Sequence, residues 1–455
     1  MKTINIYILL LILVINSKAI AQYSVLYNFN STDLTCQPTG SLTLSNNVLY
    51  GLTVSGVGTT ADDIFKINTD GTGYADIYDF KDTIGIDPLG LTISGNVLYG
   101  ITAGNENADS IGFIYKINTD GTGYKVLFKF TGTDTIGSVP QSSLILFNDT
   151  LYGTTGWGGR YDYGTVFKIN TDGTGYVDLH DFNFTNGANP YQNPLSLSGN
   201  KLYGMTYRGG ANSMGCIYKI NTDGMGYKDI HDFTENSPWP VGALTISNNV
   251  LYGSLWLGGS EGDGSFFKID TDGTAYTTLY AFNGTNGQYC LGTPAFLYNT
   301  LFGMTYAGGL NQRGIIFSIL PDGSDFSDLL DFNWMSVPLG SGPVGQLIMS
   351  DTVLYGMTLG GGGSDQGVIF KYVPVNTAIY ESLSENYVYP NPTSGILHID
   401  VQNLVKTEIF NMEGNHVGSY YGSVVDISSI PVGMYIMYIY NTDGLINREK
   451  IILSK

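Results

Sequence analysis

One tripeptide, Leu-Tyr-Gly, recurs along this chain at an almost constant interval. Consecutive copies are separated by 49, 53, 51, 49, 50 and 53 residues. A period of this size is typical of solenoids, propellers and other arrays that repeat one supersecondary unit. The period therefore predicts a repeat architecture over most of the chain. The seven copies begin at Leu49, Leu98, Leu151, Leu202, Leu251, Leu301 (here Leu-Phe-Gly) and Leu354.

Each repeat contains four short segments that favour β-strands, which we name a, b, c and d. In the third copy they are residues 142–147, 151–155, 165–169 and 176–182, rich in Val, Ile, Tyr, Phe and Thr and separated by turn residues. No window has the i, i+3, i+4, i+7 apolar spacing of an amphipathic helix, so almost no helix is expected. Segments c and d are joined by Asn-Thr-Asp-Gly or a variant, and Asp-Gly between strand-like runs indicates a hairpin.

The two ends of the repeat region complement each other. The seventh copy has segments a, b and c at 346–350, 353–358 and 368–372 but no d, whereas a lone d-like segment occupies 23–29. Pairing them removes the unpaired strand edges that an open array leaves at its ends. We therefore predict an all-β fold, a seven-bladed β-propeller of four-stranded blades over 22–373, closed by the N-terminal strand. An open solenoid is the alternative, but no polar capping repeat is visible.

The first 21 residues have the features of a secretory signal peptide. Lys2 precedes a largely apolar run at 6–15, and Ala19-Ile20-Ala21 is a small-x-small cleavage site. The run is too short for a spanning helix, and no other segment reaches the required length, so no membrane insertion is expected.

The remaining chain is strongly acidic. Removal of residues 1–21 takes away Lys2 and Lys18 and no acid, which leaves 18 basic and 39 acidic residues and a formal net charge of −21. This charge argues against nucleic-acid binding and against docking on anionic lipid.

Metal and nucleophile motifs are absent from the sequence. The three cysteines, Cys36, Cys216 and Cys290, have no Cys-x-x-Cys spacing and are interpreted as isolated thiols, with a Cys36–Cys290 bridge as the alternative. There is no His-Glu-x-x-His, no Gly-x-Ser-x-Gly and no phosphate-cradling loop. We therefore predict no catalytic residue, no metal ligand and no cofactor.

A second set of motifs follows the repeats, after a polar linker at 374–385. In order they are Tyr-Pro-Asn-Pro-x-x-Gly, Ile-Phe-Asn-x-x-Gly, Ile-Pro-x-Gly-x-Tyr and a terminal Lys-Ile-Ile-Leu. The short apolar runs among them predict a small β-sandwich over 386–455. The motif residues are Tyr389, Pro390, Asn391, Pro392, Gly395, Gly414, Pro431, Gly433 and Tyr435.

This C-terminal segment resembles the sorting domain (Por) of the Bacteroidetes type IX secretion system. The resemblance implies export by the signal peptide, engagement of the type IX machinery and passage of the outer membrane. It also implies removal of the domain, followed by release or linkage to surface lipopolysaccharide. An adhesive immunoglobulin-like module is the alternative.

The repeats carry a second resemblance. Leu-Tyr-Gly-x-Thr, then Gly-Gly, then Gly-x-(Val/Ile)-Phe-Lys-Ile-Asn-Thr-Asp-Gly-Thr-Gly-Tyr is similar to the tandem repeat called GloVer, over residues 23–372. The resemblance supports the predicted fold and implies no activity.

A propeller of this kind separates its connections between two faces. The a–b and c–d turns lie at one end of each blade, and the more variable b–c and d–a loops lie at the other. Binding usually depends on variable loops held by a regular scaffold. Aromatic rings stack on sugars or apolar groups and arginine supplies planar donors. The candidate binding residues are therefore Trp157, Arg160, Tyr207, Arg208, Trp239, Trp256, Tyr306 and Trp334, with sealing of gaps between blades as the alternative role.

Three functions remain open at this stage. The leading hypothesis is a secreted or surface-anchored, non-enzymatic module that binds an extracellular glycan or protein through the b–c and d–a loops, which also hold Arg313. A structural surface protein is another alternative. His180 and His231 align with apolar positions of the other copies and are interpreted as packing residues of segment d. The remaining alternative is a polysaccharide-active hydrolase or lyase that uses acids of this face, namely Asp62, Glu106, Asp109, Asp162, Glu261, Asp263 and Asp365.

Overall fold

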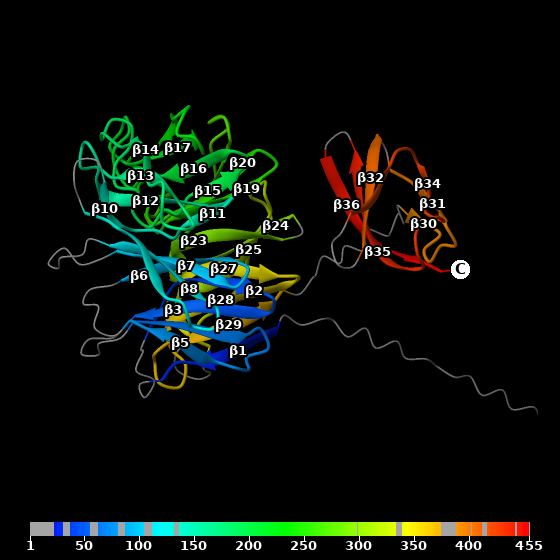
Figure 1. The fold of residues 1–455 in the computed structure, drawn as a ribbon, viewed down its shortest axis with the longest axis horizontal. Coiled ribbons are helices and arrows are strands. Elements are labelled where there is room, and N and C mark those ends of the chain that lie inside the picture. The colour runs from blue at the N-terminus through cyan, green and yellow to red at the C-terminus, as the bar shows by residue number, and fades with distance from the viewer. Residues whose placement is uncertain are drawn as a thin grey trace, which may run out of the picture. The chain divides into compact units, whose positions relative to one another are not determined.

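The computed structural model describes residues 22–30, 37–54, 62–80, 87–103, 112–131, 136–297, 299–333, 339–374, 388–401, 403–411, 416–441 and 444–454. The predicted signal peptide, the predicted linker apart from Pro374, and Cys36, Glu106, Asp109, Trp334 and Gly414 lie outside these ranges. The described residues form strands and no helix, and therefore include no helix that could cross a membrane. The chain divides into two compact units, one of Ala21–Pro374 and one that contains Val375–Lys455 (Figure 1).

Within the described part of the first unit, the strands form seven antiparallel sheets. The first three sheets are β2 (Gln37–Ser45), β3 (Val48–Val54), β4 (Asp63–Asn68) and β5 (Ala75–Asp79); β6 (Pro88–Ser94), β7 (Val97–Thr102), β8 (Phe113–Asn118) and β9 (Lys125–Lys129); and β10 (Gly137–Pro140), β11 (Ile145–Phe147), β12 (Thr150–Gly158), β13 (Thr165–Asn170) and β14 (Val177–Asp181). The third sheet has five strands because both β10, which precedes the predicted segment a, and β11, which lies within it, pair with β12.

The next three sheets repeat the same order of strands. They are β15 (Ser196–Ser198), β16 (Lys201–Met205), β17 (Cys216–Asn221) and β18 (Lys228–Asp232); β19 (Pro240–Ser247), β20 (Val250–Leu255), β21 (Ser265–Asp270) and β22 (Thr277–Ala281); and β23 (Gln288–Leu297), β24 (Thr300–Ala307), β25 (Ile315–Ile319) and β26 (Ser327–Asp331).

The last sheet of this unit joins the two ends of the repeat region. It contains β27 (Ser341–Ser350), β28 (Val353–Gly360) and β29 (Val368–Val373), and β1 (Gln22–Asn28) pairs antiparallel with β29 (Figure 1). Tyr23 is opposite Tyr372, and Val25 is opposite Phe370. The predicted pairing of the lone d segment with the seventh copy is therefore present.

Packing explains why Leu-Tyr-Gly recurs. The leucine of every copy is fully buried. The glycine has to lack a side chain, because a Cβ at Gly153 would lie 2.6 Å from Cζ of Phe167, its partner on the neighbouring strand c. A buried Phe or Tyr ring occupies the same position against the glycine in the other six copies. Leu-Tyr-Gly therefore recurs because, in each sheet, an aromatic ring of strand c packs against the glycine of strand b.

Aromatic stacking joins one sheet to the next. A ring near the end of strand d lies parallel to the ring that precedes strand d of the following sheet, with centroid separations of 3.6–4.4 Å. The two histidines take the place of an aromatic ring in this series, so their predicted packing role is confirmed. The pairs are Tyr27–Tyr74, Tyr78–Tyr124, Phe128–Tyr176, His180–Tyr227, His231–Tyr276 and Tyr280–Phe326.

The last and first sheets are in contact as well. At the junction of the sixth and seventh sheets, Leu330 and Tyr23 occupy the equivalent positions and pack in one apolar cluster. The Tyr27–Tyr74 stack then joins the seventh sheet to the first. The main-chain N–H of Gln346 donates to the side-chain Oγ of Ser41 at 3.0 Å and links the same two sheets.

The second unit contains two smaller sheets in its described residues. One has β30 (Val388–Tyr389), β31 (Ile396–Ile399) and β34 (Val424–Asp426), and the other has β32 (Leu404–Asn411), β33 (His416–Tyr420), β35 (Gly433–Asn441) and β36 (Gly444–Leu453). Both sheets contribute to a single buried cluster, which includes Leu397 and Val425 from the first sheet and Ile409 and Met437 from the second.

The C-terminal motifs converge in this unit. Asn391 Oδ1 accepts a hydrogen bond from Ile452 N at 2.9 Å, and the Tyr435 hydroxyl donates to the carbonyl of Pro431 at 2.6 Å. The main-chain N–H of Ile427 donates to the carbonyl of Gly395 at 2.6 Å. The first motif is therefore hydrogen-bonded to the terminal strand, and the third motif contains a hydrogen bond between two of its own residues.

Candidate functional site

Carboxylates of strand d hold the b–c loops. The main-chain N–H that follows the Gly-Gly pair donates to an aspartate Oδ1 at the end of strand d, from Arg160 to Asp181 at 2.8 Å and from Leu310 to Asp331 at 2.5 Å. Ala211 and Asp232 make the same contact in the fourth sheet. A carboxylate that accepts a main-chain N–H makes a strong hydrogen bond, so these loops form a fixed support for side chains.

The structure places the predicted binding residues at several different junctions between sheets. Trp157, Trp239 and Tyr306 are 42%, 36% and 38% exposed, and Arg160 and Arg208 are exposed as well. Tyr207 and Trp256 are partly buried. Trp334 lies outside the described residues.

Two positions assigned to b–c loops prove to be strand residues. Trp157 belongs to β12 and Tyr306 to β24. Strand b is longer than expected in these two sheets because it continues to pair with strand a. Trp157 is opposite Ser138, and Ala307 is opposite Gln288. Their side chains are therefore fixed by the sheet rather than by a loop.

One group of predicted residues does come together. Tyr207 and Trp239 are stacked, with centroids 5.5 Å apart and planes inclined by 23°. The guanidinium carbon of Arg208 is 5.6 Å from the centre of the Tyr207 ring. Tyr191, which the sequence did not single out, has its ring centroid 5.9 Å from that of Tyr207. We call Tyr191, Tyr207, Arg208 and Trp239 the aromatic cluster.

The other predicted residues lie apart from this cluster. Trp256 contacts Tyr289 at the next junction, with centroids 5.9 Å apart. Arg160 lies over Tyr161, 5.5 Å from its ring centre. Tyr191 lies in the d–a connection between β14 and β15, and Tyr289 is the second residue of β23. An aromatic residue shortly before or at the start of strand a is the signal that would have identified them.

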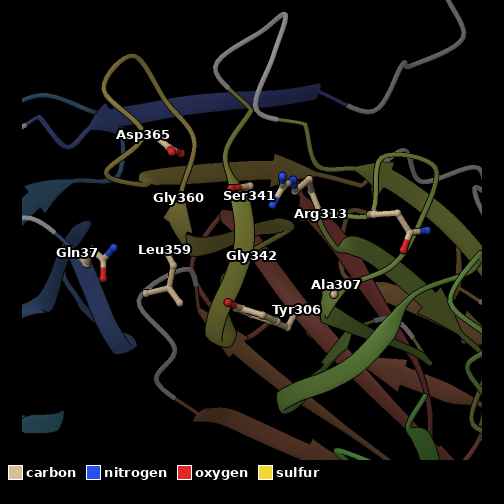
Figure 2. Close-up of a pocket in the computed structure, with 10 residues that line it drawn as sticks. Gln37, Tyr306, Ala307, Arg313, Ser341, Gly342, Leu359, Gly360 and Asp365 are labelled. Carbon is tan, nitrogen blue, oxygen red and sulfur yellow. The ribbon is translucent and has the colours of Figure 1, made fainter. Parts of the chain in front are cut away.

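A pocket of about 460 Å³ is formed where the sixth, seventh and first sheets meet. Figure 2 shows Arg313, Ser341 and Asp365 along one edge of it, with Tyr306, Leu359 and Gln37 along the other. The sequence identified only Tyr306 as a binding residue here, although Arg313 and Asp365 were assigned to the same face. The lining is completed by Ala307, Gln312, Gly342 and Gly360.

Three of the acids that the sequence assigned to this face accept hydrogen bonds. Asp162 Oδ1 accepts from Gly158 N at 2.9 Å, and Asp365 Oδ1 accepts from Gly361 N at 2.7 Å. Asp263 Oδ1 accepts from the side-chain amide of Gln288 at 2.5 Å. Such contacts stabilise the loops that carry these acids.

Several titratable groups of strand d have perturbed pKa values. Burial raises the pKa of Asp178 and of Asp328 to about 6. Burial lowers the pKa of His180 to about 4, and the same cause lowers the pKa of His231. Cys216 and Cys290 are buried free thiols, in agreement with the predicted isolated state.

Protein-family models match a portion of the first unit and the C-terminal segment. Residues 94–295 match the Gloeobacter/Verrucomicrobia repeat. Residues 387–454 match the secretion system C-terminal sorting domain. The chain carries a type IX sorting domain. This sorting domain interacts with the type IX secretion machinery and directs the protein across the outer membrane to the cell surface.

Solved structures with a similar fold are distant in sequence. An oligogalacturonate lyase from Vibrio parahaemolyticus aligns over 78% of this chain and 97% of its own, with a TM-score of 0.51 and 10% identity. An oligogalacturonate lyase in complex with manganese aligns over 78% and 96%, with a TM-score of 0.50 and 10% identity. At this identity the likeness concerns the fold alone. A search of curated proteins found no match.

Proposed function

We propose that the protein is a secreted or surface-anchored β-propeller that binds an extracellular glycan or protein through its b–c and d–a loops. The propeller would have seven blades, one for each sheet of the first unit, and would be closed by β1. The contacts of Tyr27 with Tyr74 and of Gln346 with Ser41 support closure, because they join the last sheet to the first. The proposed domains are a signal peptide (1–21), the propeller (22–373), a linker (374–385) and a β-sandwich sorting domain (386–455).

The aromatic cluster carries the proposal of a binding role. The rings that join neighbouring sheets in this protein are buried or partly buried, and Phe182 and Phe233 are at 0% exposure. Trp239 and Tyr191 are instead 36% and 41% exposed, although each contacts Tyr207. Exposed ring faces beside a guanidinium suit a ligand that offers both an apolar face and polar groups. A saccharide has this combination, as does an aromatic-rich protein surface.

A polysaccharide-active lyase or hydrolase is the second candidate. The fold likeness to oligogalacturonate lyases is the observation that favours it, with 97% of one such lyase aligned. The hydrogen bonds of Asp162 and Asp365 within their own loops, and of Asp263 with Gln288 at the start of β23, weigh against it. A structural surface protein without a ligand is the remaining candidate.

The test is a glycan-array screen of the mature chain with product analysis on every hit. We expect binding without products, and we expect Trp239→Ala to weaken it at least about tenfold, since rings of this kind dominate interfaces. Leu310→Ala is the matched control, because Leu310 is an 83% exposed apolar residue of a b–c loop. Unchanged affinity in Trp239→Ala would refute the role of the cluster, and products would favour the lyase or hydrolase.

A further inference from the structure

The pocket at Tyr306 occupies a position that is filled by a ring elsewhere in the protein. At three successive junctions, an aromatic residue that follows the Leu-Tyr-Gly segment of one sheet faces the start of strand a in the next sheet. The three aromatic residues are Tyr207, Trp256 and Tyr306, each three residues after the motif glycine. The residues that they face are Trp239, Tyr289 and Gly342.

Strand register shows that these three facing residues are equivalent. In each sheet, one residue of strand a pairs with the residue of strand b that lies two positions after the motif glycine. The facing residue comes directly before that strand a residue. The pairs are Pro240 with Leu255, Cys290 with Thr305 and Pro343 with Thr358. The backbone conformation also agrees, with φ values of 61° at Trp239, 58° at Tyr289 and 60° at Gly342.

Only the third junction lacks the second ring. Tyr207 stacks with Trp239 at 5.5 Å, and Trp256 contacts Tyr289 at 5.9 Å. At Gly342 a Cβ would be 3.1 Å from Cε2 of Tyr306. A side chain at position 342 would therefore contact the Tyr306 ring from its first atom. The space that a ring fills at the other two junctions is part of the pocket, and the Tyr306 ring remains 38% exposed.

The opposite edge of the pocket is polar. Figure 2 shows Arg313, Ser341 and Asp365 along this edge, whereas Gln37 of the first sheet lies on the other edge with Tyr306 and Leu359. The main-chain carbonyl of Arg313 accepts a hydrogen bond from Gly342 N at 2.9 Å, which fixes the glycine against the loop. Asp365 Oδ1 is held by Gly361 N, and Oδ2 has no partner among the described residues. The volume of about 460 Å³ is within the range of pockets that hold small ligands.

We infer that this pocket binds one neutral pyranose unit, whose ring face packs on Tyr306 in the space left by the glycine at 342. The hydroxyls of the sugar bind to the polar edge, where an arginine donates and an aspartate accepts. One positive and one negative side chain leave the lining without net charge, and the mature protein carries about −21, so an anionic sugar is disfavoured. This inference rests on the proposed glycan-binding function and assigns it a specific subsite.

Two variants test the pocket. Gly342→Trp reproduces the residue at the equivalent position of the fifth sheet, where tryptophan has the same φ, and fills the space over Tyr306. Tyr306→Ala removes the platform instead. Thermal unfolding establishes that each variant is folded, and Leu310→Ala is the control on the same face.

The measurement is binding of D-glucose, D-galactose, D-mannose, D-xylose and D-galacturonic acid to the mature chain by saturation-transfer NMR and titration. We expect at least one neutral sugar to bind, and both variants to weaken it at least tenfold while Leu310→Ala does not. Binding that is unchanged in Gly342→Trp and Tyr306→Ala, or restricted to D-galacturonic acid, would overturn the inference.

Retention on polysaccharides in affinity electrophoresis separates the subsite from the wider function. Retention that depends on Trp239, combined with no binding of any free sugar, would overturn the pocket inference and leave the proposed function standing. No retention and no binding of free sugars would overturn both.

Discussion

Phe29 tests whether the N-terminal strand closes the ring. Its side chain is fully buried in a cluster that contains Phe65 of the first sheet and Met357 of the last. Its main-chain N–H donates to the carbonyl of Gly367 at 3.1 Å. A phenylalanine ends strand d in the other six sheets and is buried in each of them. Phe182, at 0% exposure in the third sheet, is therefore a matched position inside the array.

The expected effect of Phe29→Ala follows from this burial. Removing a fully buried phenylalanine ring costs about 3–5 kcal/mol of unfolding free energy. Unfolding entropy of about 2.1 cal/mol/K per residue, over the roughly 350 residues of the Ala21–Pro374 unit, gives about 0.7 kcal/mol/K. Phe29→Ala should therefore lower the unfolding midpoint of this unit by about 4–7 °C.

The assay is thermal unfolding of the mature chain, followed by calorimetry and intrinsic fluorescence. Phe29→Ala and Phe182→Ala should give similar shifts if β1 belongs to the same cooperative unit as the sheets. A shift of less than about 1 °C for Phe29→Ala, with the full shift for Phe182→Ala, would refute closure by β1 and favour an open array.

Three further predictions concern packing, pH and export. Gly153→Ala should cost about 1–3 kcal/mol of unfolding free energy because its Cβ would overlap the Phe167 ring, whereas Gly363→Ala, with no atom within 4 Å of the added Cβ, should cost much less in the same urea titration. Burial lowers the pKa of His180 from 6.5 to about 4. Between these two pH values the imidazole is protonated in the unfolded chain but not in the folded one, so the free energy of unfolding should fall as pH drops from 6.5 towards 4. Comparing unfolding free energies at pH 7.5 and pH 5 should show a smaller loss in His180→Phe, and an equal loss in wild type and variant would contradict this cause. Deletion of residues 387–455, the sorting domain, should leave the protein behind the outer membrane, as cell fractionation would show, and unchanged surface delivery would exclude a sorting role.

The sequence by itself determined the repeat, its four strands and the partner of the N-terminal segment. These features depend on local patterns, because alternating apolar residues define a strand and Asp-Gly defines a turn whatever lies elsewhere in the chain. Alignment of the copies was enough to interpret His180 and His231 as packing residues. The sorting motifs were recognisable for the same reason, since their order is linear.

Only the tertiary structure decided which candidate residues meet. The sequence grouped the tryptophans on one face, but contacts across sheet junctions join Tyr207 to Trp239 and leave Trp256 with Tyr289. The pocket combines Gln37 with Asp365, which are distant in sequence and adjacent because the last sheet lies against the first. The role of Gly342 in the pocket can be recognised only when strand register aligns it with Trp239. A single glycine in a sequence rich in glycine does not show that a ring is missing at that position.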